Sequence, residues 1–194
     1  MLDRPLVYRL WQAPFAERKF APVLAHNDLA RVRRVLDVAC GPGTNARHFA
    51  GAFYLGLDLN PRYVANARRR LGRAFMAADA ARLPVRARCF DFVLVNSFFH
   101  HVDTATARGI LSALREVLTE EGRLHVLDLA LPERSGAARL LARLDRGKFA
   151  RPLDEWRALL SEQFDPLVFE PYSVGVATRT LWHMVYFQGR PRHA

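Results

Sequence analysis

The stretch Val35-Leu36-Asp37-Val38-Ala39-Cys40-Gly41-Pro42-Gly43-Thr44-Asn45 is an apolar run that contains one carboxylate and ends in a glycine-rich turn. Its apolar, β-branched character predicts a strand buried on both faces, followed by a tight loop and the start of a helix. Gly41 and Gly43 allow the turn and a close approach of the backbone to a ligand. The loop therefore places free N–H groups at a helix N-terminus, where an anionic ligand group can bind.

Two kinds of nucleotide site fit this loop. Residues 41–46 also satisfy the dinucleotide pattern G-x-G-x-x-G/A, and Asp58 follows at about the right distance. Asp37, inside the strand before the loop, favours the other kind, because a carboxylate repels a pyrophosphate and attracts an ammonium group. The ligand expected at this turn is thus an amino acid moiety.

An acidic residue and a glycine-rich loop after the first strand resemble motif I of the class I S-adenosylmethionine-dependent methyltransferases. The resemblance extends along the chain, because further apolar runs end at Asp58 and Asp79, and residues 90–96 are similar to the family's fourth strand. It implies that Asp58 binds the ribose hydroxyls of the cofactor and that Asp79 contacts its adenine amino group. The family usually has glycine where this chain has Ala39, so we expect the extra methyl group to weaken cofactor binding.

The resemblance implies that S-adenosylmethionine lies at the carboxyl ends of the first four strands. The residues expected to contact it are Asp37, Ala39, Cys40, Gly41, Pro42, Gly43, Asn45, Asp58, Leu59, Asp79, Ala80, Asn96 and Ser97. Because this cofactor already carries a good leaving group, the protein mainly positions the acceptor and removes water. No acid–base pair is required, and the methyl acceptor is not readable from the motifs.

His100 and His101 are the candidate catalytic residues, since they follow the fourth strand on the side where α/β sheets bind ligands. Either one could orient or deprotonate an acceptor, because histidine titrates near neutral pH. The alternative is that both line the cleft before a helix that Asp103 or Thr104 caps. Their adjacency predicts rings that point in different directions, and we favour His101 for contact near the cofactor.

The segment Asn96-Ser97-Phe98 lacks both prolines of the Asn/Asp-Pro-Pro-Tyr motif found in methyltransferases that act on base amino groups. This difference counts against a base as the acceptor. The favoured function is methyl transfer to a small molecule. The alternatives are an NAD(P)-dependent oxidoreductase, a non-catalytic S-adenosylmethionine-binding protein, and an RNA or protein methyltransferase. Lys19 and Lys148, the two lysines, offer no Tyr-x-x-x-Lys set for hydride transfer.

The expected fold is α/β, a three-layer α-β-α sandwich with a seven-stranded, mostly parallel sheet and a C-terminal antiparallel strand. The expected strands are 35–38, 53–59, 75–79, 90–96, 123–130, 167–169 and 178–188, and the expected helices are 61–70, 104–118 and 153–163. A turn is expected at residues 120–122.

Two further segments flank this pattern. Residues 1–30 are expected to form short helices, interrupted at Pro14 and Pro22, that either cap the sheet or close over the cofactor as a lid. The resemblance implies that residues 31–194 form the methyltransferase domain, with a helical insertion at about 131–152 that is expected to shape the acceptor pocket. The candidate acceptor-side residues there and just beyond are Asp145, Arg146, Arg151 and Trp156.

Composition limits the partners. The chain has 194 residues, 51% of them hydrophobic, which suits one α/β domain. A net charge of +10 raises nucleic acid as a partner, but the cations are nearly all arginines spread along the chain, so a small-molecule acceptor is favoured over nucleic acid. Neither Cys40 nor Cys89 has metal-ligand spacing, and no signal peptide or membrane-spanning run is found, so we expect a cytoplasmic protein without a metal or a membrane partner.

Overall fold

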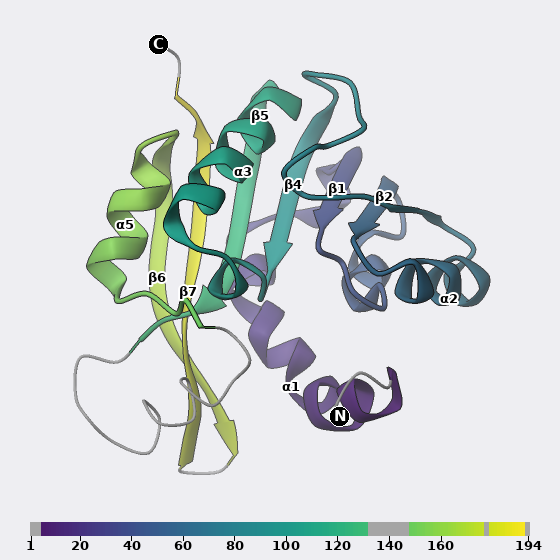
Figure 1. Ribbon diagram of the computed structural model, residues 1–194, viewed down its shortest axis with the longest axis horizontal. Coiled ribbons are helices and arrows are strands. Elements are labelled where there is room, and N and C mark those ends of the chain that lie inside the picture. The colour runs from purple at the N-terminus through teal and green to yellow at the C-terminus, as the bar shows by residue number, and fades with distance from the viewer. Residues whose placement is uncertain (1–4, 132–147, 177–178, 193–194) are drawn as a thin grey trace.

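A seven-stranded sheet with the strand order β3-β2-β1-β4-β5-β7-β6 forms the centre of the computed structural model (Figure 1). The structure describes residues 5–131, 148–176 and 179–192, with side chains in the first helix from Phe15 onward. The strands are β1 (Arg34–Val38), β2 (Phe53–Asp58), β3 (Ala74–Ala77), β4 (Phe90–Asn96), β5 (Leu118–Leu129), β6 (Phe164–Val176) and β7 (Arg179–Pro191). Strands β1 to β5 pair in parallel, whereas β7 is antiparallel to both β5 and β6. The predicted fold class is confirmed.

The strand order reverses between β1 and β4, and this point decides where a ligand binds. In open α/β sheets, ligands bind outside the carboxyl ends of the strands that flank such a reversal. The loops that follow β1, β2 and β4 therefore carry the candidate site.

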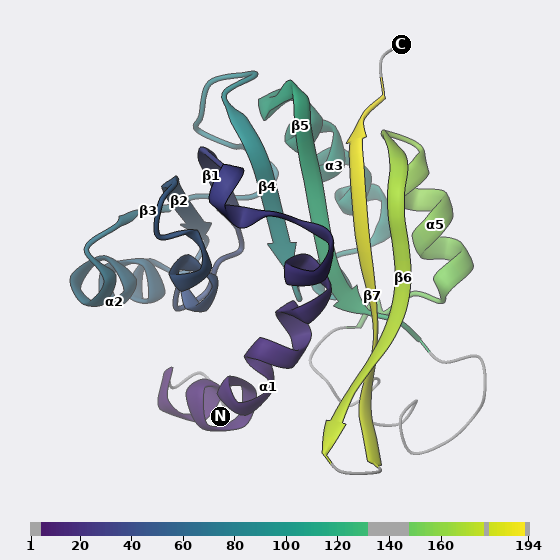
Figure 2. The ribbon, with the colours of Figure 1, turned by 180° about the vertical axis from the view of Figure 1, so that it is seen from behind.

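Helices cover both faces of the sheet. The α-helices are α1 (Pro5–His26), α2 (Pro61–Leu71), α3 (Thr104–Val117) and α5 (Leu153–Ser161), and the 3₁₀ helices are η1 (Leu29–Arg31), η2 (Thr44–Phe49) and η3 (Phe99–His101). One face lies under α3 and α5, and α1 crosses the opposite face (Figures 1 and 2). Asn60 caps α2 by accepting a hydrogen bond from the Arg62 backbone N–H, and Asp103 caps α3 by accepting one from Thr106.

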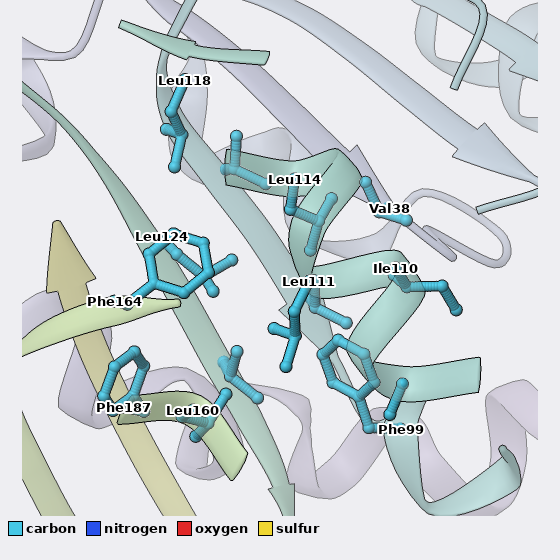
Figure 3. Close-up of a cluster of buried hydrophobic side chains, with 14 of the residues drawn as sticks. Val38, Phe99, Ile110, Leu111, Leu114, Leu118, Leu124, Leu160, Phe164 and Phe187 are labelled. Carbon is cyan, nitrogen blue, oxygen red and sulfur yellow. The ribbon is translucent and has the colours of Figure 1, made fainter. Parts of the chain in front are cut away.

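Alternate residues of β1 supply two separate apolar cores. Leu36 and Val38 pack with α3 and α5, and Val35 packs with α1, η2 and α2. Figure 3 shows the first core, where Leu111 and Leu114 of α3 face the same cluster as Leu124, Leu160, Phe164 and Phe187. Because both faces of β1 are buried in this way, the strand that precedes the glycine-rich loop is held rigidly.

The N-terminal segment differs from the expectation. It is one helix from Pro5 to His26, bent along its length (Figure 1), rather than short helices interrupted at Pro14 and Pro22. Phe20 and Val23 are fully buried against the sheet. Their burial outweighs the helix hydrogen bonds that a proline removes. The structure places this helix over one face of the sheet (Figure 2). The side chains of Tyr8, Arg9 and Trp11, the residues of this segment proposed for a lid, lie outside the described part.

Other elements also differ from the expectation. The helix expected after the glycine-rich loop is the 3₁₀ helix η2. The turn expected at residues 120–122 is instead a register shift within β5, where Gly122 approaches the backbone so closely that a Cβ atom would lie 2.8 Å from the Phe90 carbonyl oxygen. Strand β6 extends through Pro166 and Pro171, which an edge strand tolerates because no further strand needs their missing N–H groups.

The expected insertion at 131–152 falls mostly outside the described residues, together with Asp145 and Arg146. The two described ends of this segment are joined by a hydrogen bond of 2.8 Å, which the Leu131 N–H donates to the Arg151 carbonyl oxygen. Within the described residues, no helix has the length and apolar character needed to cross a membrane.

Candidate functional site

The glycine-rich loop after β1 is tight on one side and open on the other. Gly41 and Gly43 both have positive φ, +53° and +76°, which side chains rarely allow. A Cβ atom on Gly43 would lie 2.7 Å from the ring of Phe75, so only glycine fits there. A Cβ atom on Gly41 would meet no described atom within 4 Å. The loop thus packs on β3 through Gly43 and leaves space beside Gly41.

Asp37 of β1 is fully buried behind this loop. Its Oδ2 atom accepts hydrogen bonds from the Tyr54 hydroxyl at 2.6 Å and from Asn45 Nδ2 at 3.1 Å. Its Oδ1 atom has no hydrogen-bond partner among the described residues. Burial raises the pKa of Asp37 to about 7, although the two hydrogen bonds oppose this rise. A buried carboxylate oxygen of this kind fits a cationic ligand group.

Asp58, at the end of β2, organises the backbone of the loop. Its Oδ2 atom accepts a hydrogen bond from the Gly41 N–H, and its Oδ1 atom accepts one from the Asn60 N–H. Both hydrogen bonds are 2.8 Å long. One carboxylate therefore joins the glycine-rich loop to the start of α2. Because each carboxylate oxygen has two lone pairs, capacity to accept a ligand hydroxyl remains.

The ends of β2 and β3 lie beside each other through a hydrogen bond from the Ala78 N–H to the Asp58 carbonyl oxygen. Asp79 follows as an exposed residue whose side chain accepts from the Ala81 N–H at 2.9 Å. Leu59 is 75% exposed. At this edge of the sheet Leu59 therefore provides an apolar surface, and Asp79 provides a carboxylate.

The end of β4 joins the same network. Asn96 Nδ2 donates to Asn45 Oδ1 at 3.3 Å, and the Ser97 hydroxyl donates to Asn96 Oδ1 at 3.1 Å. A continuous series of side-chain hydrogen bonds thus runs from Asp37 through Asn45 and Asn96 to Ser97. Ala39 and Ser97, each just beyond its strand, have positive φ of +56° and +58°. Such conformations cost about 1 kcal/mol or more in a residue with a Cβ atom, and they often occur at functional sites.

The histidine loop is held by a second buried carboxylate. Asp128, near the end of β5, accepts from the His100 ring Nδ1 at 2.5 Å and from the N–H groups of Phe98, Phe99 and Leu129. Burial alone would raise the pKa of Asp128, but the positive charge available on His100 and these hydrogen bonds lower it. Through these contacts Asp128 caps the histidine loop.

The two histidines differ in exposure. His100 is buried and His101 is exposed, with ring centroids 4.0 Å apart and planes tilted by 43°. The burial of one ring and the exposure of the other agree with the predicted difference in direction, although the two ring centroids lie close together. The hydrogen bond between its Nδ1 and Asp128 holds the His100 ring on the buried side, and His101 lies on the exposed side.

Arg151 and Trp156 do not face solvent as acceptor-side residues would. Arg151 is 3% exposed and donates to the carbonyl oxygens of Phe99, Val102 and Phe149. Trp156 is fully buried, and its indole N–H donates to the Leu129 carbonyl oxygen at 2.9 Å. The expectation of an acceptor-side role is wrong for both, since their polar atoms hold the backbone around the histidine loop.

Comparisons with known proteins show what the sequence of this chain resembles. Residues 35–122 match the family model described as a methyltransferase domain. Over 102 residues the chain is 37% identical to a demethylmenaquinone methyltransferase of Beutenbergia cavernae, covering 51% of this chain and 42% of that protein. Residues 35–122 thus match a methyltransferase domain, and the chain has the class I methyltransferase fold. The methyl donor of this family is S-adenosylmethionine, as the sequence predicted.

Two further similarities concern part of the sequence and the overall fold. A trans-aconitate 2-methyltransferase of Methylobacterium nodulans is 45% identical over 71 residues, which cover 34% of this chain and 28% of that protein. The N-methyltransferase NodS of Bradyrhizobium japonicum, solved with S-adenosylhomocysteine, shares the fold with a TM-score of 0.77. That match has 16% identity and covers 99% of this chain and 95% of NodS. The matched segments span less than half the length of these two curated relatives.

The structure of the methyltransferase domain gathers most of the residues predicted to bind the cofactor. The chain of hydrogen bonds joins Asp37, Asn45 and Asn96, and Asp58 joins the loop at Gly41. Sequence reasoning missed Tyr54. Its register supplies a signal, because Tyr54 pairs with Val35 and so lies diagonally across from Asp37 on the same face. A tyrosine hydroxyl in an otherwise apolar buried strand needs a partner, and the strand next to it holds the carboxylate.

Proposed function

We propose that this methyltransferase domain transfers the methyl group of S-adenosylmethionine to a small-molecule acceptor. The observation that carries the proposal is the buried Asp37 Oδ1 atom, which accepts no hydrogen bond from the described part of the chain, behind a loop that is open at Gly41. An ammonium group satisfies such an oxygen, whereas a pyrophosphate would be repelled by it. This favours an amino acid cofactor over NAD(P).

The residues around Asp37 fit the rest of that cofactor. Asp58 has lone pairs left for the ribose hydroxyls, and the exposed Asp79, followed by Ala80, suits an adenine amino group. Leu59 offers an exposed apolar surface next to them. The remaining proposed contacts come from the loop and the end of β4, namely Ala39, Cys40, Gly41, Pro42, Gly43, Asn45, Asn96 and Ser97.

The main task of the protein in this reaction is to position the cofactor and the acceptor. When bound, S-adenosylmethionine supplies a methyl group on a positively charged sulfur, which is a good leaving group. The chain binds and orients the acceptor in line with that methyl group and excludes water from it. His101, exposed beside the buried His100, is the residue proposed to orient or deprotonate the acceptor, and His100 is the second candidate.

The class of acceptor is proposed from the relatives. Their names specify demethylmenaquinone and trans-aconitate, which are small molecules. The basic net charge of +10 is the feature that keeps RNA as the competing acceptor.

Calorimetric titration with S-adenosylhomocysteine and with NADH tests the cofactor. We expect binding of the first ligand and not of the second. Asp58→Ala should weaken binding at least tenfold, because it removes both the proposed ribose contact and the anchor of the Gly41 N–H. NADH binding, or no binding of S-adenosylhomocysteine by the unaltered chain, would overturn the proposal.

Asp91→Ala is the matched control for that variant. The Asp91 carboxylate also accepts two backbone hydrogen bonds, from Arg33 and Arg34 at 3.0 Å each, but at the opposite end of β1. It should lower stability without changing the affinity for S-adenosylhomocysteine. An equal loss of affinity in both variants would mean that Asp58 acts only through general stability.

The acceptor is tested with methyl-labelled S-adenosylmethionine. Separate reactions contain trans-aconitate, a water-soluble analogue of demethylmenaquinone, or bulk RNA. Label transferred to a small molecule supports the proposal. Label in RNA, with binding that weakens steeply as salt rises, would replace it with an RNA methyltransferase.

A further inference from the structure

Tyr54 holds the carboxylate on which the proposed cofactor site depends. Its hydroxyl donates to Asp37 Oδ2 at 2.6 Å, the shorter of the two hydrogen bonds to that carboxylate. The Tyr54 ring is buried, with Phe49 and Phe75 at centroid distances of 6.1 and 5.6 Å. Packing on two sides fixes the ring, so its hydroxyl has a defined position.

Both donors to Asp37 act on the same oxygen. Tyr54 and Asn45 each bond to Oδ2, while Oδ1 receives no hydrogen bond from any residue that the structure describes. A carboxylate held through one oxygen cannot rotate freely about its terminal bond. The second oxygen therefore stays in one place, available to a ligand.

We propose that Tyr54 is the positioning residue for the amino group of the cofactor: its hydroxyl holds Asp37 so that Oδ1 remains available to the ammonium. This inference rests on the proposed function and deepens it. Tyr54 touches neither the methyl group nor the acceptor, and it acts through Asp37.

The charges around Asp37 make this role sensitive to pH. Asp58 raises the pKa of Asp37 further, and the nearby Cys40 thiol stays neutral because burial raises its own pKa. The Arg73 guanidinium lies 5.4 Å from the centre of the Tyr54 ring. The Tyr54 hydrogen bond favours the ionised carboxylate, so its removal shifts the ionisation of Asp37 to higher pH.

The test compares Tyr54→Phe with the unaltered chain by calorimetric titration between pH 6 and 8.5. S-adenosylhomocysteine is one probe, and 5′-methylthioadenosine, which has the same nucleoside but no amino acid group, is the other. At pH 7 we expect about a tenfold loss for S-adenosylhomocysteine, since one hydrogen bond to a charged group is lost, with partial recovery at pH 8.5. The affinity for 5′-methylthioadenosine should not change.

Tyr172→Phe is the matched control, because its half-buried hydroxyl donates to the Lys19 carbonyl oxygen at 2.8 Å, away from the loop. It should leave both affinities and the pH profile unchanged. Asn45→Ala removes the longer of the two hydrogen bonds and should shift the pH profile in the same direction by a smaller amount.

Two results would overturn the inference. In the first, Tyr54→Phe keeps the affinity and pH profile of the unaltered chain. In the second, its affinities for both probes fall equally at every pH, which would show that Tyr54 supports the structure of the loop in general. Neither result would touch the proposed function, which fails only if the unaltered chain does not bind S-adenosylhomocysteine.

Discussion

Asp37 and Asp128 are both fully buried near the carboxyl ends of strands, yet their environments have opposite effects. Burial raises the pKa of Asp37 to about 7, whereas hydrogen bonds and the His100 charge lower the pKa of Asp128. Asp128 receives three backbone N–H groups and an imidazole, while Asp37 keeps one oxygen without a partner in the described structure. A buried carboxylate that the protein satisfies stabilises the fold. One that the protein leaves incomplete is, in our proposal, directed at a ligand.

The largest expected effect is on stability. Asp128→Ala should lower the free energy of unfolding by about 3–5 kcal/mol, because it leaves the buried His100 and three N–H groups without their acceptor. Asp37→Asn should lower it by less than about 1 kcal/mol or raise it. Urea denaturation at pH 7 without ligand measures both values. Equal losses in the two variants would remove the distinction between the two carboxylates.

The pH dependence of stability sharpens the comparison. Because the pKa of Asp37 is about 7 in the folded state and near 4 when unfolded, the folded state binds more protons between these values. Its contribution to stability is therefore lost as the pH rises from 4 to 7, by on the order of 4 kcal/mol.

The difference between the unaltered chain and Asp37→Asn, followed by denaturation from pH 4 to 8, isolates that slope. Asp128, with its lowered pKa, loses its contribution as the pH falls below about 4. The buried His125, whose pKa is also lowered, loses its contribution as the pH falls below about 6.5. Both effects cancel in the difference, so a flat difference would show that Asp37 has an ordinary pKa.

A smaller effect is expected at Arg151, which binds the carbonyl groups of the histidine loop while Asp128 binds its N–H groups. Arg151→Met should cost about 2 kcal/mol of stability, since buried carbonyl oxygens lose their donors. Arg108→Met is the control, because its ion pair with Glu162 is on the surface, where solvent screens it, and its loss should cost less stability than the loss of Arg151. Equal losses of stability in the two variants would mean that the hydrogen bonds of Arg151 to the histidine loop do not stabilise the fold.

The smallest effect concerns the strained residues after β1 and β4. Ala39→Gly and Ser97→Gly should each stabilise the chain by about 0.5–1 kcal/mol, because glycine adopts positive φ without the Cβ penalty. Thermal denaturation measures this gain, and S-adenosylhomocysteine titration shows whether the Ala39 methyl group also weakens binding. A loss of stability in Ala39→Gly would mean that its methyl packing outweighs the strain.

Much of the cofactor side could be predicted because its signals are local. The glycine-rich loop, the Asn60 cap with Pro61 and the acids that end successive strands each lie within a few residues of the element they define. Strand β4 has the expected limits, and β1, β2 and α2 differ from theirs by a residue. The histidine loop was predicted less well, since the burial of His100 depends on its hydrogen bond to Asp128 in a distant strand.

The sequence by itself determined the order of strands and helices, the loop after β1 and the carboxylate expected to meet the amino acid part of the cofactor. Only the tertiary structure decided that Tyr54 completes Asp37, that Asp128 supports the histidine loop and that Arg151 points inward. These contacts join residues separated by 17, 28 and 52 positions. Hydrophobic period and turn chemistry act over a few residues, but whether a buried polar atom is satisfied depends on what the rest of the fold brings to it.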